Sequence, residues 1–518
     1  MTAGEKVRSI QLSLFPTNDI QYSINDWSVE SFSADSLCCE AARIELEKKY
    51  LPITEVAEKF NRQSVSYQLS KRDCIHSWLK YKEGFSADLV EMLIDEMGIK
   101  SGDTIFDPFL GSGTTSFVAQ TLGINSLGFD VLPMTVVAMN AKSNVSKYSI
   151  SELKEFLAFI SSANRPNTYD KRVKYISITS SAYPEETEHD IPYFSELIEQ
   201  SNYSTKVKDL GLLCILNSLE RSSYTAKDGQ YLRWDERSKK VIEANALRIA
   251  AGKKPFRVVL NKGELPSLQH LLIEELKKAI RDIEFLQNNI PTLGLQVSTN
   301  YKQCSSLTEL PLLADECING VITSPPYCNR YDYTRIYALE LAYLGLGEKE
   351  IRQARQDLLS CTVESKSKLE FLRDYYTTLN RETDYKKVVE IISSNAAIKE
   401  VISALEFRSD NGDVNNKNVI KMVKGYFVEL AFIYYELFRI CKNGSSVAFV
   451  NDNVRYAGEV IPVDFISTEI ARQIGFKPLK IYTLKQQKGN SSQQMKKFGR
   501  VPLRKSITIW IKEGSRYS

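Results

Sequence analysis

The sequence has little of what identifies a metal site, a secreted protein or a membrane protein. Its three histidines lie far apart, so we expect no histidine-rich metal site and no metal. The nine cysteines include no C-x-x-C pair, and no charged-then-apolar signal segment stands at the N-terminus, so we expect a reducing, cytoplasmic environment. No apolar run reaches about eighteen residues, so we expect no membrane-spanning helix and no membrane partner.

Net charge is nearly absent and does not by itself indicate a partner. The 67 Lys and Arg residues against 64 Asp and Glu residues leave +3, so any basic face must be local. A hydrophobic fraction of 43% and a charged fraction of 25% are typical of globular proteins and exclude a disordered chain. The length of 518 residues allows roughly two to four domains, or one large core with insertions.

A strand, a glycine loop, a helix and a second strand follow one another in the first third of the chain. The apolar run 104–106 leads into Asp-Pro-Phe-Leu-Gly-Ser-Gly-Thr-Thr at 107–115, and the pattern predicts a helix over 114–122. A second strand over 126–129 ends at Asp130. This order is typical of half of a doubly wound nucleotide-binding sheet.

Five later runs complete the predicted sheet. They lie at residues 295–299, 321–323, 446–450, 479–484 and 506–511. Since seven strands are spread over about 400 residues, and connections in such sheets are usually short, the sheet must be interrupted. The predicted fold class is therefore α/β, with a Rossmann-like seven-stranded sheet, helices on both faces and largely helical insertions.

The glycine loop has the residues of a cofactor site. Gly111 and Gly113 allow a ligand to approach the backbone, and Asp130 at the next strand end suits a hydrogen bond to ribose hydroxyls. The loop lacks the third glycine of dinucleotide sites and the lysine of a P-loop. Asp107 would repel a phosphate and attract a cation, which favours S-adenosylmethionine. The alternative for Asp107 is a helix N-cap.

The second informative segment is Thr-Ser-Pro-Pro-Tyr at residues 323–327, directly after a predicted buried strand. Two prolines fix the backbone and leave carbonyl groups free as acceptors. Ser324 and the Pro325 carbonyl can accept the protons of an exocyclic amine, while Tyr327 stacks on a flipped base. The alternative is a rigid turn with a half-buried tyrosine. The next residue, Cys328, is misplaced for a C5-directed nucleophile and is predicted to pack.

These two segments resemble motifs I and IV of the amino-methyltransferases that modify exocyclic amines in DNA, and Ser-Pro-Pro-Tyr is similar to the cytosine-N4 subgroup. Residues 78–86 resemble the segment that holds the methionine end of the cofactor; 329–333 and 451–453 resemble the continuations after motif IV and the fifth strand. The resemblance implies catalytic roles for Ser324, Pro325, Pro326 and Tyr327. It implies S-adenosylmethionine contacts by Lys82, Phe85, Asp107, Phe109, Gly111, Gly113, Thr114 and Asp130.

One segment departs from the family pattern. The family often has an acidic or amide residue at the end of the third strand, contacting adenine, whereas residues 301–305 contain no acid. Gln303 is the available amide, and the adenine contact stays unassigned.

Double-stranded DNA is the expected partner, and two basic segments are candidates for contacting it. Residues 485–505 carry seven cations and no acid, and we expect phosphate contacts from Lys496, Lys497, Arg500 and Arg504. Arg233, in a mixed basic and aromatic stretch at 227–234, is a further candidate. The alternatives are an ordinary solvated loop for the first segment and a turn that packs Trp234 for the second.

The predicted organisation is one interrupted core. It consists of a leader (1–70), the cofactor half of the core (71–145), an insertion that is a candidate DNA-recognition region (146–294), the Ser-Pro-Pro-Tyr part (295–346), a helical insertion (347–425) and the C-terminal part with the basic loop (426–518). The function expected is cytosine-N4 methylation of DNA, in a restriction or defence setting that can include a cognate restriction endonuclease. Adenine-N6 or RNA-base methylation, and a catalytically inactive DNA-binding subunit, are the alternatives.

Overall fold

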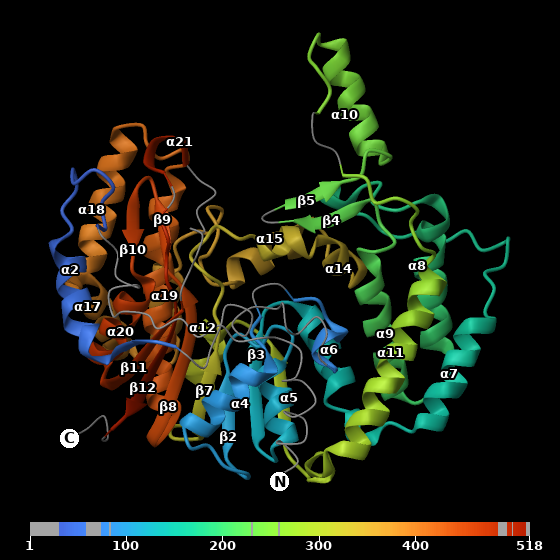
Figure 1. Ribbon diagram of the computed structural model, residues 1–518, viewed down its shortest axis with the longest axis horizontal. Helices are drawn as coiled ribbons and strands as arrows, with labels where there is room; N and C mark the ends of the chain where they lie inside the picture. Colours follow the sequence, from blue (N-terminus) through green and yellow to red (C-terminus); the bar gives the residue numbers. More distant parts are fainter. Residues whose placement is uncertain are drawn as a thin grey trace, which may run out of the picture.

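A mostly parallel eight-stranded sheet forms the centre of the protein (Figure 1). The computed structural model describes residues 31–57, 74–81, 84–228, 231–256, 260–484, 495–499 and 501–513. The strand order is β1-β11-β12-β8-β7-β2-β3-β6, and β12 is antiparallel to both of its neighbours. The strands are β1 (Thr54–Val56), β2 (Thr104–Asp107), β3 (Asn125–Asp130), β6 (Thr299–Gln303), β7 (Ile318–Thr323), β8 (Cys441–Asp452), β11 (Phe476–Leu484) and β12 (Lys505–Lys512).

The predicted fold class is confirmed, and the sheet has one strand more than expected. All seven predicted strands are present, although β6 begins at Thr299, where the prediction ended. The additional strand, β1, comes from the first 70 residues and pairs in parallel with β11. Its three residues, Thr-Glu-Val, are too few to show a period, which is why the sequence did not reveal it.

Alternating residues of the strands build two separate cores. Phe106, Val321 and Phe449 face the layer of α19 (Asn418–Ile440) and α20 (Val463–Ile474). Their sequence neighbours Ile105 and Ile322 face α4 (Ala87–Glu96) and α5 (Thr114–Thr121) on the opposite side. Successive side chains of a strand point to opposite faces, so both faces of this sheet carry apolar side chains. Helices cover both faces, as predicted.

Two large insertions interrupt the sheet. The first, on the right of Figure 1, contains α7 (Ile150–Ser162), α8 (Glu185–Gln200), α9 (Thr205–Leu219), the hairpin β4 (Thr225–Asp228) and β5 (Tyr231–Trp234), α10 (Lys239–Ala250) and α11 (Leu268–Asn289). The second contains α15 (Glu348–Asp357), α16 (Leu369–Thr378), α17 (Glu382–Ser394) and α18 (Ala396–Asp410). It ends inside the sequence range predicted for it, because α19 already begins at Asn418. No helix in the described part of the chain is long and apolar enough to cross a membrane.

The chain changes direction across the sheet at β2. From β2 it runs outward to β3 and β6, and it then returns to β7 on the other side of β2. The loops after β2 and β7 therefore lie side by side at the carboxyl edge. Ligands of open α/β sheets bind in the crevice at such a switch point.

Candidate active site

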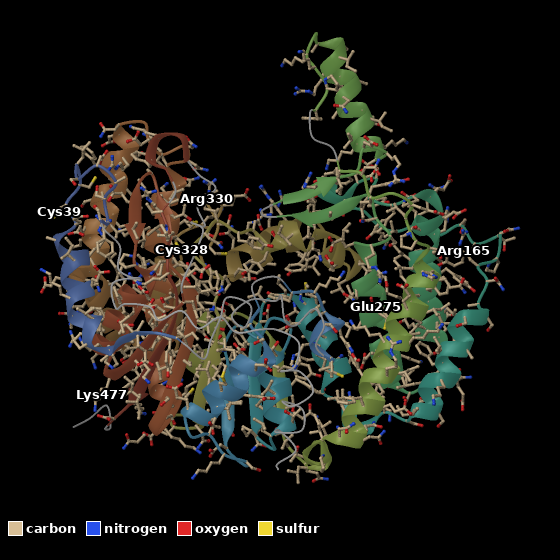
Figure 2. The ribbon with its side chains drawn as sticks, viewed as in Figure 1. Cys39, Arg165, Glu275, Cys328, Arg330 and Lys477 are labelled. Atoms are coloured by element: carbon tan, nitrogen blue, oxygen red, sulfur yellow. The ribbon has the colours of Figure 1, made fainter. Side chains whose placement is uncertain are left out.

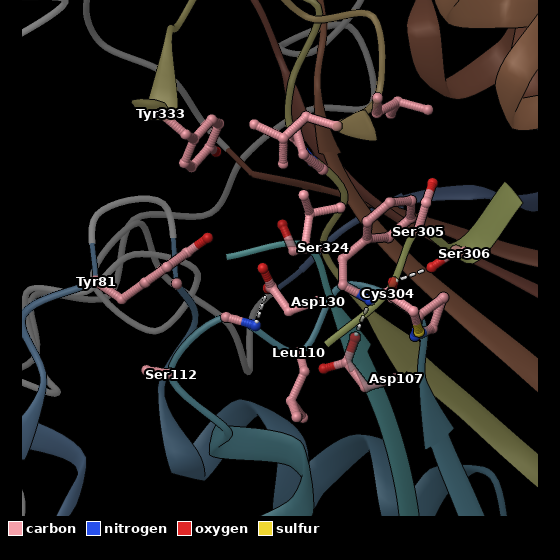
Figure 3. Close-up of a pocket in the computed structure, with 18 of the residues that line it drawn as sticks. Tyr81, Asp107, Leu110, Ser112, Asp130, Cys304, Ser305, Ser306, Ser324 and Tyr333 are labelled. Carbon is pink, nitrogen blue, oxygen red and sulfur yellow. Dashed lines mark hydrogen bonds between the residues drawn. The ribbon is translucent and has the colours of Figure 1, made fainter. Parts of the chain in front are cut away.

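A cavity at this switch point brings the two sequence motifs together (Figure 3). Its wall combines residues from the segment before α4, the loop after β2, the end of β3, the loop after β6 and the loop after β7. The predicted site residues in the wall are Phe85, Asp107, Phe109, Gly111, Thr114, Asp130, Ser324 and Pro326. Segments separated by more than 200 positions in the sequence thus form one pocket.

The conformation of the glycine loop requires glycine at two positions, where a side chain would be strained. Gly111 and Gly113 have φ values of +55° and +80°. A Cβ atom at Gly113 would lie 2.1 Å from Sδ of Met139, and one at Gly111 would lie 3.1 Å from Cε1 of Tyr81. The buried Lys142 Nζ donates to the Ser112 carbonyl at 2.7 Å and so stabilises the loop. Gly113 does not line the cavity itself and shapes the turn into α5.

Asp107 ties the two motif loops together. Its Oδ1 accepts from Thr323 Oγ1 at 2.5 Å and from the Phe109 amide at 3.0 Å, and its Oδ2 accepts from Thr115 Oγ1 at 2.8 Å. The N-cap of α5 is Gly113, with no side-chain cap. The alternative interpretation of Asp107 as a helix N-cap is therefore wrong.

Asp130 is the second buried carboxylate of the cavity. It accepts from the Gly111 amide at 2.8 Å and from the Leu132 amide at 2.8 Å. Burial raises the pKa of both Asp107 and Asp130 to about 6, because the charged form loses its hydration. Two buried carboxylates in one pocket suit a ligand that carries positive charge and hydroxyl groups.

Ser324 presents an acceptor to the cavity. Its Oγ lies 3.0 Å from the Tyr327 hydroxyl and 3.2 Å from the Val450 carbonyl, and its single proton can be donated to either oxygen. Because the hydroxyl proton is engaged there, the oxygen lone pairs are available to an N–H donor. Pro326 lines the cavity beside Ser324, whereas Pro325 is buried and absent from the wall.

Tyr327 is covered rather than open to the cavity. Its side chain is 1% exposed, and Lys505 Nζ lies 4.9 Å from its ring centroid. The same ammonium lies 3.8 Å from Asp452 Oδ1 at the end of β8. The ring thus has a cation on a face that a stacked base would need.

Sequence reasoning missed several wall residues. Tyr81, in the segment singled out before the glycine loop, stacks on Tyr337 with centroids 5.2 Å apart. Ser306 donates to the Pro108 carbonyl at 2.5 Å. Leu358 and Leu359 reach the cavity from the second insertion, for which the sequence had no signal. The predicted Lys82 lies outside the described residues.

Gln303, the amide available at the end of the third strand, is not part of the cavity wall, and the adenine contact stays unassigned. Gln303 is exposed, donates to the Val131 carbonyl at 3.3 Å and does not line the cavity. The next residues, Cys304 and Ser305, do line it, together with Asp357 from the end of α15. Ser305 Oγ donates to the Asp357 carbonyl at 2.9 Å, which joins the loop after β6 to the second insertion.

One predicted DNA contact requires correction. Arg504 is 5% exposed, and its guanidinium pairs with Asp464 at 2.7 Å and with Glu47 at 3.3 Å, so it is not available to a phosphate. Lys497 is exposed and forms an ion pair with Asp413. The Lys496 side chain and Arg500 lie outside the described residues.

The segment at 227–234 is a β-hairpin rather than a helix-end turn. The Lys227 side chain is 5% exposed and pairs with Glu340 on α14 (Ala338–Tyr343), which docks the hairpin onto the core. Lys240 Nζ lies 4.5 Å from the ring centroid of the half-buried Trp234. Arg233 is half-buried on β5, and its contact with DNA stays a prediction.

Cys328 packs in the interior, as predicted. It is 0% exposed, its carbonyl accepts from the Tyr456 hydroxyl at 2.6 Å, and burial raises the pKa of its thiol well above the usual value. Figure 2 shows it near Arg330, above the sheet. Such a thiol is a poor nucleophile at neutral pH. Among the described residues, no group of three His, Cys, Asp or Glu side chains is arranged to hold a metal.

Comparisons with known proteins agree with this geometry. Residues 14–139 match a family model described as DNA methylase, so the match extends into the first 70 residues. The chain is 52% identical to Type II methyltransferase M.BsoBI of Geobacillus stearothermophilus, over 95% of this chain and 96% of the relative. It is 38% identical to Type II methyltransferase M.AvaI of Nostoc sp., over 99% and 100%. It is 24% identical to Type II methyltransferase M.MjaII of Methanocaldococcus jannaschii, over 52% and 62%.

Proposed function

Since the chain belongs to the Type II DNA methyltransferases, we propose that it transfers a methyl group from S-adenosylmethionine to the exocyclic N4 amine of cytosine in double-stranded DNA. The observation that carries the proposal is the position of Ser324 on the cavity wall. This residue stands first in the Ser-Pro-Pro-Tyr motif, faces the cavity and directs its own proton away from it. The carbonyl and hydroxyl oxygens of this segment are acceptors, which is what an amine substrate requires.

The residue types of the cavity wall support S-adenosylmethionine as the cofactor. Asp107 and Asp130 are buried carboxylates that would bind the cationic methionine end and the ribose, respectively. The turn at Gly111 leaves the backbone open to the cofactor, and Phe85 and Tyr81 supply apolar wall. When bound there, the cofactor supplies an electrophilic methyl group.

The chemistry left to the protein is orientation and charge stabilisation. The N4 lone pair of cytosine is delocalised into the ring, so the amine must rehybridise to attack. Ser324 Oγ would accept an N–H group of the amine and stabilise the positive charge that develops on nitrogen. The Pro325 carbonyl, predicted as a second acceptor, does not line the cavity. Holding the two reactants in line contributes on the order of 7–11 kcal/mol, and no covalent enzyme intermediate is needed.

Stacking of the base on Tyr327 requires a local rearrangement. A base that stacks on the face covered by Lys505 would displace this ammonium, which also lies 3.8 Å from Asp452. The alternatives of adenine-N6 and RNA substrates keep the same cavity. Serine, rather than an acidic or amide residue, at position 324 weighs against adenine. A Type II methyltransferase implies a restriction–modification setting, and we propose a cognate endonuclease as its functional counterpart.

Labelled S-adenosylmethionine tests the proposal. The protein is incubated with the cofactor and either duplex DNA or RNA, and the polymers are digested to nucleosides. Label in N4-methylcytosine from DNA supports the proposal; label in N6-methyladenine or in RNA contradicts it. Failure of both transfer and cofactor binding would identify an inactive subunit.

A further inference from the structure

A basic groove lies next to the cofactor cavity, between residues 363–369 and the first turns of α19. Its volume is about 650 Å³. Lys366, Lys421 and Lys424 line it and are exposed. In the described part of the chain, none of the three has an ion-pair partner. The sequence did not single out any of these lysines.

The lysines of α19 form a stripe along one side of the helix. Lys421 and Lys424, together with Lys417 at the N-cap, stand at spacings of four and three, so their side chains lie on one face. Like charges at this spacing destabilise a helix by a few tenths of a kcal/mol per pair. An anion that binds across the stripe would relieve this repulsion.

The acidic residues of the groove are already neutralised. Glu429 is 1% exposed, pairs with Lys368 at 2.8 Å and accepts from the Ser360 amide at 2.8 Å. Glu364 pairs with Arg335 and, at 2.6 Å, with Arg355. The charge that the groove presents to solvent is therefore positive.

The same stretch of chain forms one wall of the groove and one wall of the cofactor cavity. Leu358 and Leu359 line the cavity, and the next residue, Ser360, binds Glu429 in the groove. Lys368 Nζ also donates to the Leu358 carbonyl at 3.0 Å. On the other wall, the hydroxyl of Tyr426 accepts from Asn451 at the end of β8, at 3.0 Å. A polymer held in the groove would thus pass beside the catalytic edge.

We propose that this groove binds the phosphate backbone of the DNA next to the target base. The proposal rests on the DNA substrate of the proposed function and assigns the contact to the second insertion and α19. Isolated, exposed ammonium groups suit phosphates, since each contact releases counterions from the duplex.

The test compares two triple variants of the full chain. In the groove variant, Lys366, Lys421 and Lys424 are each changed to Gln. In the matched control, Lys386 and Lys387 of α17 and Lys399 of α18, exposed in the same insertion, are each changed to Gln. The affinity for a fluorescent duplex is measured by anisotropy over a range of salt concentrations, with cofactor binding and thermal melting as checks of folding.

We expect the slope of log affinity against log salt to decrease by about 0.9 for each lost contact, and the affinity at physiological salt to fall about tenfold or more. The control variant should match the wild type. An unchanged slope in the groove variant, or an equal loss in the control, overturns the proposal. Because both variants keep Ser324 and the cofactor site, the nucleoside they methylate at saturating DNA and low salt reports separately on the proposed function.

Discussion

Lys505 Nζ lies over the ring of Tyr327, 4.9 Å from its centroid, and so covers the aromatic face on which the target base is proposed to stack. The pair joins two distant parts of the chain, the loop after β7 and the first residue of β12. Asp452, 3.8 Å from the same ammonium, completes the arrangement. The cation therefore covers one face of the ring in the absence of DNA.

Removing the cation and its partner charge should open this position. We expect the double variant Lys505→Met with Asp452→Asn, which keeps the net charge, to bind target duplex more tightly than the wild type in the presence of cofactor. Because the loss of a lysine normally weakens DNA binding, tighter binding by this variant would indicate that the ring face has been opened. Anisotropy measures the affinity, and the double variant Lys477→Met with Glu513→Gln, at an exposed ion pair, serves as the control with the same net charge. Weaker binding by the double variant would show that Lys505 does not obstruct the base.

Tyr327 should matter to turnover and not to the cofactor. Tyr327→Ala is expected to retain S-adenosylmethionine binding and lose most of kcat, because base stacking contributes about 1–3 kcal/mol, or roughly 5- to 150-fold. Tyr327→Phe keeps the ring and should retain far more activity. Calorimetry of cofactor binding and single-turnover kinetics separate the two effects. If Tyr327→Ala abolishes cofactor binding, the base pocket has been misplaced.

The pKa values of Asp107 and Asp130 predict how cofactor affinity depends on pH. Burial raises both pKa values from 3.8 to about 6, so both groups are charged above that pH and become neutral as the pH falls through it. Affinity for a cationic cofactor should therefore be constant in the neutral range and decrease below about pH 6. Calorimetric titration at constant ionic strength measures this. An affinity that stays constant down to about pH 5 would contradict the assignment.

Glycine at position 113 should be needed for the shape of the loop. In Gly113→Ala, the Cβ would meet Met139 Sδ at 2.1 Å, in addition to the strain of a φ of +80°. Gly98→Ala is a matched control with φ +66° and no atom within 4 Å, so it carries only the backbone strain, about 1–2 kcal/mol. We expect the first variant to lose cofactor affinity and the second to lose only some thermal stability. Equal affinities would show that the loop does not need this turn.

Arg504 should act in folding rather than in DNA binding. Arg504→Ala leaves Asp464, which is 2% exposed, without its partner, and we expect a loss of about 3–5 kcal/mol in the free energy of unfolding. Lys497→Ala, at an exposed ion pair, should change stability by less than about 1 kcal/mol. Chemical denaturation measures both. A stable Arg504→Ala protein with a reduced salt slope would restore the phosphate contact.

The motif residues could be read from the sequence because each follows a short apolar strand. Asp107 is the last residue of β2 and Ser324 directly follows β7, and the parallel sheet brings such strand ends to one edge. Burial of Arg504 and the position of Lys505 could not be read in this way. Both depend on strand and helix partners far away in sequence, and a run of cations has the same local pattern whether it is buried or solvated.

The insertions were recognised by their length and not by their contacts. Leu358 and Leu359 resemble any apolar helix end, and only the folded chain shows that they enter the cofactor cavity. Likewise β1 lacks a period of its own and is defined by its pairing with β11. Local patterns thus predicted the chemistry of the site, while the walls around it depend on tertiary packing.

Mass analysis of the modified nucleoside tests the central claim most directly. Duplex DNA is treated with the protein and S-adenosylmethionine that carries a deuterated methyl group, digested, and the labelled nucleoside is identified by chromatographic retention and fragmentation. We predict deoxycytidine with the deuterated methyl group on N4, and loss of that product in Ser324→Ala with cofactor binding retained. Label on adenine N6 or on cytosine C5 would contradict the account.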